Sequence, residues 1–485
     1  MDRKISHLQP EVVWSYFEDI CQVPRPSKKE EKIIAFLEAF ARANRLDFKK
    51  DEAGNVLISA PASPGFEKLP TVILQSHLDM VCEKNNEVTH NFDTDPIQPY
   101  IDGEWVKARG TTLGADCGIG IAASMAVLTD KETEHGPLEC LFTVDEETGL
   151  TGAFALQPDF MSGKILLNLD SEDEGELFIG CAGGVDTIAS IEHKREAVPK
   201  GYFPLKIKVS GLLGGHSGDD IHKGRGNAIK VLVRFLWEAA QQYGIRLASI
   251  DGGNLRNAIA REASAVLMVQ NGYKENLMAA FNIFANDVKE ELAINEPSLR
   301  MELGSCDQPE TVIEENASSR LINALYACPH GIHSMSYRMP GLVETSTNLA
   351  SVKMKNEHQI EVTTSQRSDR ESGKKDIASM VSAVFEMAGA SVRQTDGYPG
   401  WAPNPESKVL DVTVRSYKEL FGEAPIVRSI HAGLECGLFL EKYPGLDMVS
   451  FGPTILGAHS PDERINIETV QKFWAHLQLI LKSIE

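Results

Sequence analysis

Hydrophobic and polar positions follow a helical period at the start of the chain. Residues 8–22 and 27–44 each place apolar residues three or four positions apart, which predicts two helices. Ser27 and Glu30 have the spacing of a capping box ahead of the second helix. The chain therefore opens with a helical segment.

Short continuous apolar runs follow this segment, and they change the predicted fold class. The runs are 71–77, 138–144, 164–169 and 446–451. Runs of this length are typical of strands buried on both faces, which indicates an α/β domain with a mostly parallel sheet. A helix rich in Ala and Gly is predicted over 118–129.

The pattern changes between about residues 185 and 398, where amphipathic strands and helices alternate. The predicted strands are 204–209, 262–269, 349–354 and 359–364, and the predicted helices lie near 226–243, 275–292 and 374–388. We expect this segment, 185–398, to be an α+β domain inserted into the α/β domain, which occupies 1–184 and 399–485. No tandem sequence repeat is evident.

Composition narrows the classes of function. The chain has 485 residues, with 48 Lys and Arg against 69 Asp and Glu, a net charge of −21. Such a surface repels phosphate backbones and anionic lipid, so we expect no nucleic-acid or membrane partner. Residues 1–19 contain no apolar segment typical of a secretory signal, so we expect none, and no apolar run is long enough to span a membrane. The eight cysteines are scattered without a CxxC pair, which favours reduced thiols in a cytoplasmic protein.

Ligand-type residues follow the ends of the predicted buried strands. These residues are His77, Asp79, Asp145, Glu146, Glu147, Asp170 and His459, and Asp116 directly precedes the helix at 118. Because the carboxyl ends of strands in an open α/β sheet share one edge, we expect these side chains to meet there. A single acid at a strand end is commonly a solvated loop residue, but crowded carboxylates require a cation. Imidazole and carboxylate ligands favour two divalent ions such as zinc or manganese.

Several short motifs carry a resemblance to a known family. They are His-Leu-Asp-Met-Val at 77–81, Gly-Ala-Asp at 114–116, Glu-Glu at 146–147, Asn-Leu-Asp-Ser-Glu at 168–172 and His-Ser-Pro at 459–461. They resemble the dinuclear metallopeptidases, a family that includes carboxypeptidase G, aminoacylase and bacterial dipeptidases. The longer stretches 95–116, 211–222, 256–262 and 430–439 resemble the branch that hydrolyses aminoacyl-histidine (Xaa-His) dipeptides. The resemblance extends from about residue 10 to the C-terminus.

The resemblance implies a role for each residue at the strand ends. Asp116 bridges two metal ions, zinc being expected first and manganese or cobalt next, and its peptide bond to Cys117 is cis. Asp79 orients His77, and Glu146 is the general base that takes a proton from a metal-bridging water. The implied metal ligands are His77, Asp116, Glu147, Asp170 and His459.

The resemblance also implies that the inserted domain is a lid over the substrate. His216 would reach the substrate carbonyl, and Arg367 would hold the substrate carboxylate through its bidentate guanidinium. Arg370 is a rival for that carboxylate. Asn257 and Gly433 would line the same pocket.

A few positions leave alternatives open. Cys117 stands where the family commonly has Asn or Asp, which leaves its role beside the metals undecided. Glu435 is either a substrate contact or a structural carboxylate, and Asp145 is expected to be a solvated or hydrogen-bonded neighbour of the two glutamates. Gly118 and Gly120 mimic a dinucleotide-binding fingerprint, which requires a strand ending directly before Gly118.

The function implied is metal-dependent hydrolysis of Xaa-His dipeptides by a homodimer. Within the same family, a deacylase or an exopeptidase of different specificity is the alternative. A peptide-binding protein without activity would have lost a ligand or the base, and this sequence retains all of them. A nucleotide-dependent oxidoreductase would need the strand before Gly118.

Overall fold

The computed structural model describes residues 3–485, and their contacts divide the chain into two units. Unit 1 comprises Met1–Gly180, Pro403–Ser429 and Leu434–Glu485, and unit 2 comprises Cys181–Ala402 and Ile430–Gly433. The segment of unit 2 between Cys181 and Ala402 begins and ends four residues outside the insert that the sequence predicts, 185–398. Among residues 3–485, no helix is both long and apolar enough to cross a bilayer.

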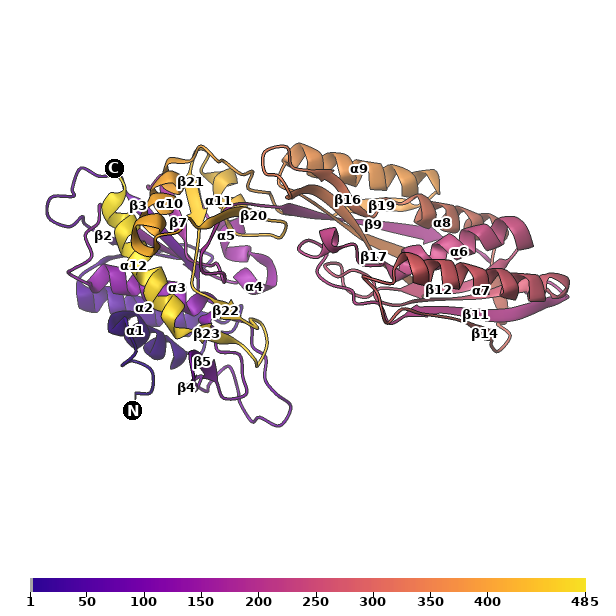
Figure 1. The fold of residues 1–485 in the computed structure, drawn as a ribbon, viewed down its shortest axis with the longest axis horizontal. Coiled ribbons are helices and arrows are strands. Elements are labelled where there is room, and N and C mark those ends of the chain that lie inside the picture. Colours follow the sequence, from indigo (N-terminus) through magenta and orange to yellow (C-terminus); the bar gives the residue numbers. More distant parts are fainter. Residues whose placement is uncertain (1–2) are drawn as a thin grey trace. The chain divides into compact units, whose positions relative to one another are not determined.

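Unit 1 is built on a mixed sheet of eight strands (Figure 1). In sheet order these are β1 (Asp47–Lys50), β2 (Val56–Ala60), β6 (Leu138–Thr143), β3 (Val72–His77), β7 (Ile165–Asn168), β21 (Asp447–Ser450), β8 (Glu176–Cys181) and β20 (Ile426–Ile430). The four central strands β6, β3, β7 and β21 are parallel to one another, and they match the four apolar runs of the sequence.

The outer strands depart from the expected parallel arrangement. β1 and β2 pair antiparallel, β2 pairs antiparallel with β6, and β21 pairs antiparallel with β8. β1 and β2 are joined by a short turn over residues 51–55, and so short a connection permits only an antiparallel pair. The strands that carry the candidate ligands are therefore parallel to one another, within a sheet that is mixed as a whole.

Helices and a small second sheet complete unit 1 (Figure 1). The helices are α1 (Glu11–Cys21), α2 (Glu31–Asn44), α3 (Ala115–Thr129), α4 (Glu146–Gly149), α5 (Thr151–Ala155), α10 (Lys408–Phe421), α11 (Cys436–Lys442) and α12 (Ile467–Ser483). The small sheet joins β22 (Ile455–Leu456), β23 (Arg464–Asn466), β5 (Trp105–Ala108) and β4 (Pro99–Asp102). β5 ends ten residues before Gly118, so no strand precedes the glycines as a dinucleotide fingerprint requires.

The predicted capping box before α2 is wrong. The N-cap of α2 is Glu30, and no side chain caps the helix. The Glu30 carboxylate instead accepts hydrogen bonds from the backbone N–H groups of Lys28 and Asp145, and the Ser27 hydroxyl donates to Asp79. Ser27 and Glu30 therefore bind the loops that follow β3 and β6. These hydrogen bonds outweigh the local preference of the two side chains for capping the helix.

Unit 2 contains the βαββαβ arrangement twice. The first copy runs through β11 (Tyr202–Ser210), α6 (Ala228–Tyr243), β12 (Arg246–Gly252), β13 (Ala263–Gln270), α7 (Lys274–Glu291) and β14 (Arg300–Ser305). The second uses β9 (Gly183–Glu192), α8 (Glu315–Ala327), β17 (Val343–Asn356), β18 (Gln359–Ser368), α9 (Glu371–Met387) and β19 (Ser391–Gln394). The first copy is inserted between β9 and α8 of the second.

The two copies form one continuous sheet in the order β14-β11-β13-β12-β17-β18-β9-β19. Each copy has its strands in the order fourth, first, third, second, counted from its outer edge, and the copies meet where Gly252 of β12 pairs with Val352 of β17. Off this path lie β16 (Gly331–Met335), which pairs with β17, and a pair formed by β10 (Arg195–Ala197) and β15 (Thr311–Ile313).

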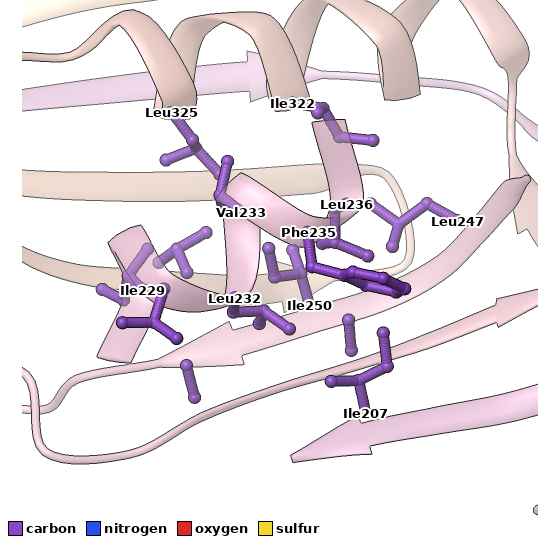
Figure 2. Close-up of a cluster of buried hydrophobic side chains, with 14 of the residues drawn as sticks. Ile207, Ile229, Leu232, Val233, Phe235, Leu236, Leu247, Ile250, Ile322 and Leu325 are labelled. Carbon is purple, nitrogen blue, oxygen red and sulfur yellow. The ribbon is translucent and has the colours of Figure 1, made fainter. Parts of the chain in front are cut away.

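The core of unit 2 lies between this sheet and its helices. Figure 2 shows α6 residues Leu232 and Phe235 directed toward the strands, and Val233 close to Leu325 of α8. All of these side chains are buried, and burying each contributes about 1.5–3 kcal/mol. Asn227 begins α6 by accepting hydrogen bonds from two backbone N–H groups, and left-handed Gly244 ends it.

Candidate active site

The predicted site residues fall into two groups, one in each unit. In unit 1, the C-terminal ends of the four parallel strands deliver the candidate ligands to one edge of the sheet. β3 ends at His77, β6 leads into the turn with Glu146 and Glu147, and β7 is followed by Asp170. His459 reaches the same place from the segment after β21.

Asp116 lies at the centre of this group. One of its oxygens, Oδ1, is 3.1 Å from His77 Nε2, and the other, Oδ2, is 3.2 Å from His459 Nε2. His77 Nε2 is also 3.3 Å from Asp170 Oδ1, and His459 Nε2 is 3.1 Å from Glu147 Oε2. The two oxygens of one carboxylate thus face two separate sets of ligand atoms. The peptide bond between Asp116 and Cys117 is cis, as the resemblance implied.

The spacing of these atoms fits divalent metal ions. Ligand atoms bound at about 2.0–2.1 Å to one tetrahedral zinc lie about 3.3 Å apart. The groups Asp116–Glu147–His459 and His77–Glu146–Glu147 each bring their ligand atoms within 4.8 Å. Glu147 Oε1 is buried without a hydrogen-bond partner among the described residues, and Asp170 Oδ1, also buried, has only its 3.3 Å contact with His77. Buried carboxylate oxygens normally have partners, so a cation fits this site.

The ionisation of the histidines reflects a strongly negative environment. Burial alone would lower the pKa of His77, but Asp170, Asp116 and Asp79 outweigh it and hold that pKa well above its usual range. Hydrogen bonds with Asp116 and Glu147 raise the pKa of His459 to about 11. Both imidazoles are therefore protonated in this arrangement. Their positive charge balances the carboxylates as the charge of a bound cation would.

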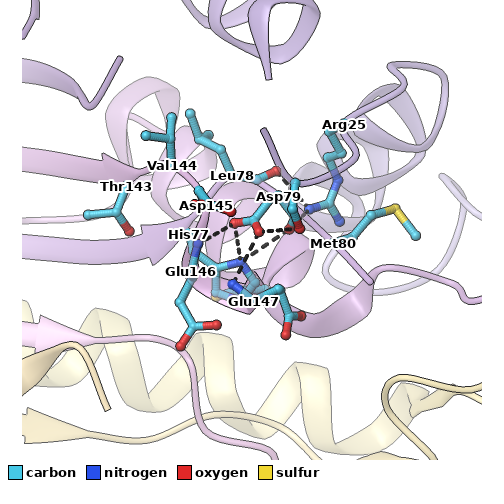
Figure 3. Close-up of polar contacts among 12 residues, drawn as sticks. Arg25, His77, Leu78, Asp79, Met80, Thr143, Val144, Asp145, Glu146 and Glu147 are labelled. Atoms are coloured by element: carbon cyan, nitrogen blue, oxygen red, sulfur yellow. Dashed lines mark hydrogen bonds and ion pairs between the residues drawn. The ribbon is translucent and has the colours of Figure 1, made fainter. Parts of the chain in front are cut away.

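Asp79 is the centre of a second layer of contacts (Figure 3). Its Oδ1 is 3.3 Å from His77 Nδ1, and its two oxygens accept hydrogen bonds from the backbone N–H groups of Glu146 and Glu147 at 3.0 and 3.2 Å. Ser27 donates to it as well, at 2.7 Å. Burial opposes ionisation, but His77 and these donors lower the pKa of Asp79 to about 2. Asp79 therefore fixes the ring of His77 and the turn that carries both glutamates.

Glu146 and Glu147 differ in their contacts although they are neighbours in the turn. Glu147 is one of the groups facing His459, whereas the Glu146 carboxylate has no hydrogen bond or ion pair among the described contacts. Figure 3 shows both side chains pointing away from Asp79, with their carboxylates apart. Burial raises the pKa of Glu146 well above its usual range, and the carboxylates of Asp170, Glu435 and Glu147 raise it further. Such a group is suited to hold a proton.

Asp145 belongs to a separate acidic group with Glu30 and Asp79. Its oxygens accept hydrogen bonds from the hydroxyls of Thr148 and Thr151, and Glu30 accepts from the Asp145 backbone. Protein donors therefore satisfy these carboxylates. Asp145 is 3% exposed, so of the two expected alternatives it is a hydrogen-bonded neighbour of the two glutamates and not a solvated one.

Cys117 is buried next to the ligand group. Its thiol donates to the Leu169 carbonyl at 3.4 Å, and its Sγ lies within 4.8 Å of ligand atoms of His77 and Asp170. Burial raises the pKa of this thiol well above its usual range, and Asp170 raises it further. In this arrangement the thiol is protonated and bonds a carbonyl, and its sulfur also lies where an ion held by His77 and Asp170 would be within reach.

Glu435 ties the ligand-bearing strands together. Its Oε2 accepts hydrogen bonds from Gln75 of β3 and Thr143 of β6, both at 2.7 Å, and Asn168 of β7 donates to Gln75. Gln75 and Asn168 each lie two residues before a candidate ligand, His77 or Asp170. Glu435 is 1% exposed, so these contacts favour the structural alternative over a substrate contact.

In unit 2, Arg367 of β18 lies at the centre of the second group. It is 6% exposed, its Nη1 donates to the Tyr398 hydroxyl at 2.8 Å, and its Nη2 lies 3.4 Å from His216 Nε2. Its Nε lies 3.4 Å from the Ser217 hydroxyl. Within residues 3–485 no carboxylate pairs with this guanidinium, although Arg is an effective partner for one. Arg370, the rival, is instead paired with Glu344 at 3.2 Å.

His216 is held in one orientation by its own loop. Its Nδ1 accepts hydrogen bonds from the backbone N–H groups of Gly218 and Asp219, so a neutral ring carries its proton on Nε2. Burial and the charge of Arg367 lower the pKa of His216, which favours the neutral ring. In this tautomer His216 presents Nε2–H as a donor, and its 3.4 Å contact with Arg367 Nη2, which can only donate, is not a hydrogen bond.

Asn257 and Gly433 lie at the border of this second group. The Asn257 backbone carbonyl accepts the N–H of Ser217 at 2.8 Å, next to His216, while its side chain makes no hydrogen bond within residues 3–485. A Cβ at Gly433 would lie 2.8 Å from the Tyr398 ring, so a side chain there would displace that tyrosine. Tyr398 itself was not predicted, because a tyrosine in a Gly-Tyr-Pro-Gly turn carries no signal of a partner 31 residues away.

Comparisons with known proteins agree with this geometry. Residues 73–483 match Peptidase family M20/M25/M40. The chain belongs to this peptidase family. The cytosol non-specific dipeptidase of Escherichia coli (strain K12) is 45% identical to it over 481 residues, covering 99% of each chain.

Solved structures of other proteins share the fold. The aminoacylhistidine dipeptidase from Vibrio alginolyticus aligns with a TM-score of 0.94 at 44% identity, covering 100% of this chain and 99% of that one. The aminopeptidase PepT from Bacillus cereus aligns with a TM-score of 0.59 at 16% identity over 98% and 99%, which shows the fold alone. Family membership makes this chain a peptide hydrolase and excludes the oxidoreductase alternative.

Proposed function

We propose that this protein is a dinuclear metal-dependent dipeptidase that prefers Xaa-His dipeptides. The observation that carries the proposal is the position of Asp116, whose two oxygens face His77 and His459 at 3.1 and 3.2 Å. One ion would be held by His77, Asp116 and Asp170, and the other by Asp116, Glu147 and His459. Imidazole and carboxylate donors in four-coordinate spacing favour zinc, with manganese and cobalt as alternatives.

The residues of unit 1 would divide the work of amide hydrolysis. When bound, the ions lower the pKa of water and polarise the scissile carbonyl. Glu146, whose carboxylate makes no hydrogen bond or ion pair within residues 3–485, takes the proton of the attacking water and passes it to the leaving amine. Asp79 holds the ring of His77 and, through two backbone hydrogen bonds, the turn that bears Glu146.

The residues of unit 2 would bind the rest of the substrate, and this unit would act as the lid. His216 donates its Nε2–H to the substrate carbonyl as negative charge develops there. Arg367 binds the α-carboxylate of the dipeptide, supported by the Tyr398 hydroxyl, while Asn257 and Gly433 line the same pocket. A carboxylate bound in this way lies one residue beyond the scissile bond, which selects dipeptides over longer peptides.

The substrate class rests on the relatives. A dipeptidase and an aminoacylhistidine dipeptidase are similar to this chain over nearly all of its length, at 45% and 44% identity. A cytoplasmic location is proposed from the cytosolic relative and from the scattered free cysteines. A homodimer is proposed as the assembly.

A substrate panel tests the proposal. Purified protein with its metal content measured should be assayed on Xaa-His and Xaa-Gly dipeptides, on the corresponding tripeptides and on acetyl-amino acids. We expect hydrolysis of dipeptides, with Xaa-His substrates showing the highest kcat/KM. Preference for acetyl-amino acids would make the protein a deacylase, and preference for tripeptides would remove the proposed role of Arg367.

A further inference from the structure

The loop that carries His459 is poorly enclosed for a candidate metal ligand. The His459 side chain is 54% exposed, and its backbone has a φ of +63°, the left-handed region that non-glycine residues rarely adopt. A ligand in such a loop needs a contact that fixes its position. The loop itself supplies one, because Glu463 follows His459 by four residues.

The Glu463 side chain is buried against the segment that ends at Asp116. It is 2% exposed, and its two oxygens accept hydrogen bonds from four consecutive backbone N–H groups. The distances are 2.7 Å from Leu113, 2.9 Å from Gly114, 2.7 Å from Ala115 and 3.3 Å from Asp116. The backbone N–H of Glu463 donates to the Ser460 carbonyl at 3.0 Å, which closes the turn after His459.

Four converging N–H groups form a site for an anion, and only a carboxylate satisfies all four. A glutamine in the same place would direct its own NH₂ group at some of these donors and leave them unsatisfied. Arg25, which is 3% exposed, contacts the same segment by donating to the Gly114 carbonyl. Glu463 thus binds the N–H groups of residues 113–116, and Arg25 binds a carbonyl of the same segment. Together they fix the backbone that leads to Asp116.

We propose that Glu463 is a positioning residue of the metal centre: it fastens the loop of His459 to the backbone of Asp116, so that both ligands reach the same ion. This inference rests on the proposed function, in which His459 and Asp116 share an ion. Glu463 touches neither ion nor substrate. Its effect passes through the positions of the two ligands, as contacts behind metal ligands commonly do.

Glu139 provides a matched control in unit 1. It is 8% exposed, and its carboxylate accepts from the backbone N–H groups of Ser162 and Gly163 and from the Ser162 hydroxyl. It fastens a loop as Glu463 does, but that loop carries no candidate ligand. Glu139→Gln should therefore reproduce the loss of stability without the effect on metal binding.

The test is a zinc competition titration with a chromophoric chelator on the stripped proteins. We expect Glu463→Gln to bind zinc about 10–100-fold more weakly than wild type, whereas Glu139→Gln keeps the wild-type affinity. Glu463→Asp keeps the charge but is too short to reach all four donors, so it should also bind more weakly and serves if the glutamine variant is unstable. Amide exchange over residues 113–116 should be faster in both Glu463 variants.

Two results would overturn the role of Glu463. Zinc affinity in both Glu463 variants equal to that of wild type would show that the ligands hold their positions without it. An equal loss of affinity in Glu139→Gln would show that the effect is general destabilisation. Wild-type protein that takes up no zinc, manganese or cobalt would instead overturn the proposed function, and this inference with it.

Discussion

At the residue scale, the proposed chemistry depends on different roles for neighbouring carboxylates in the ligand group. Glu146 and Glu147 are adjacent in the chain, yet only Glu147 contacts His459. Asp116, Asp170 and Glu147 each have an oxygen 3.1–3.3 Å from an imidazole nitrogen. The Glu146 carboxylate, although it lies within 4.8 Å of His77, makes no such ion pair among residues 3–485, which leaves it free to move a proton. This division between ligands and base can be tested by replacing each of the two glutamates with glutamine in turn.

Glu146→Gln should abolish most of the hydrolysis while leaving metal content at the wild-type level. The variant removes a proton acceptor and not a ligand, and a general base contributes about 10²–10⁴ in rate. Glu147→Gln is the comparison, and it should lose bound metal because its carboxylate faces His459 at 3.1 Å. Measuring kcat and metal content on both proteins decides the matter. Near-normal turnover in Glu146→Gln would reassign the base.

Arg367→Ala should reduce the preference for a free carboxylate at the end of the substrate. A hydrogen bond to a charged group contributes about 1.5–3 kcal/mol, so the ratio of kcat/KM for an Xaa-His dipeptide over its amide should fall about 10–150-fold. Arg370→Ala is the control, because Arg370 is already paired with Glu344. The same ratio in all three proteins would exclude Arg367 from carboxylate binding.

At the scale of elements, the four parallel strands could be predicted because each is a continuous apolar run. Their ends could also be predicted to converge, because parallel strands share an edge, and the resulting ligand group is the one the sequence suggested. The failed prediction of a capping box shows the limit of local patterns, because Ser27 and Glu30 bind residues 52 and 115 positions away in the sequence.

Hydrogen bonds between a side chain and distant backbone groups could not be predicted from the sequence, unlike the convergence of the strand ends. Glu463 binds N–H groups almost 350 residues before it, and Arg25 binds carbonyls after β3. Every residue has an N–H and a carbonyl, so the sequence around such partners carries no distinguishing pattern. Tyr398 could not be predicted either, because the residue that donates to its hydroxyl, Arg367, lies on another element and no sequence pattern links the two.

α12 carries a histidine that should make unit 1 less stable in acid. His476 is 3% exposed, its Nε2 bonds the Thr413 carbonyl at 2.9 Å, and its ring packs against Tyr417 and Phe451. Burial lowers the pKa of His476 to about 4, below its value in the unfolded chain. The stability that depends on the neutral ring is therefore complete above about pH 6.5 and is lost as the pH falls toward 4.

This loss amounts to about 2 kcal/mol at pH 5. Measured with a chelator present, wild-type protein should lose more thermal stability between pH 7.5 and pH 5 than His476→Gln, by about 4–8 °C. His7→Gln, a change at an exposed histidine of the same unit, should behave like wild type. If the two proteins lost the same Tm over this range, His476 would not be the titrating group.

At the scale of the whole molecule, the chain separates the candidate ligands from the candidate substrate contacts. Unit 1 holds the ligand group, and unit 2 holds His216, Arg367 and Tyr398. Unit 2 could be predicted as an α+β insert, but its two βαββαβ copies could not, because they share a topology and not a sequence pattern. His216 follows β11 of the first copy and Arg367 lies on β18 of the second, so the two copies together supply this group.

The central claim is that two ions sharing Asp116 are required for dipeptide hydrolysis. The most direct measurement is to strip the protein of metal and titrate zinc back while following hydrolysis of an Xaa-His dipeptide, with Asp116→Asn in parallel. We predict no activity without metal, full activity only when two ions per chain are bound, and no recovery in Asp116→Asn. Full activity in the stripped protein, or at one ion per chain, would contradict the account.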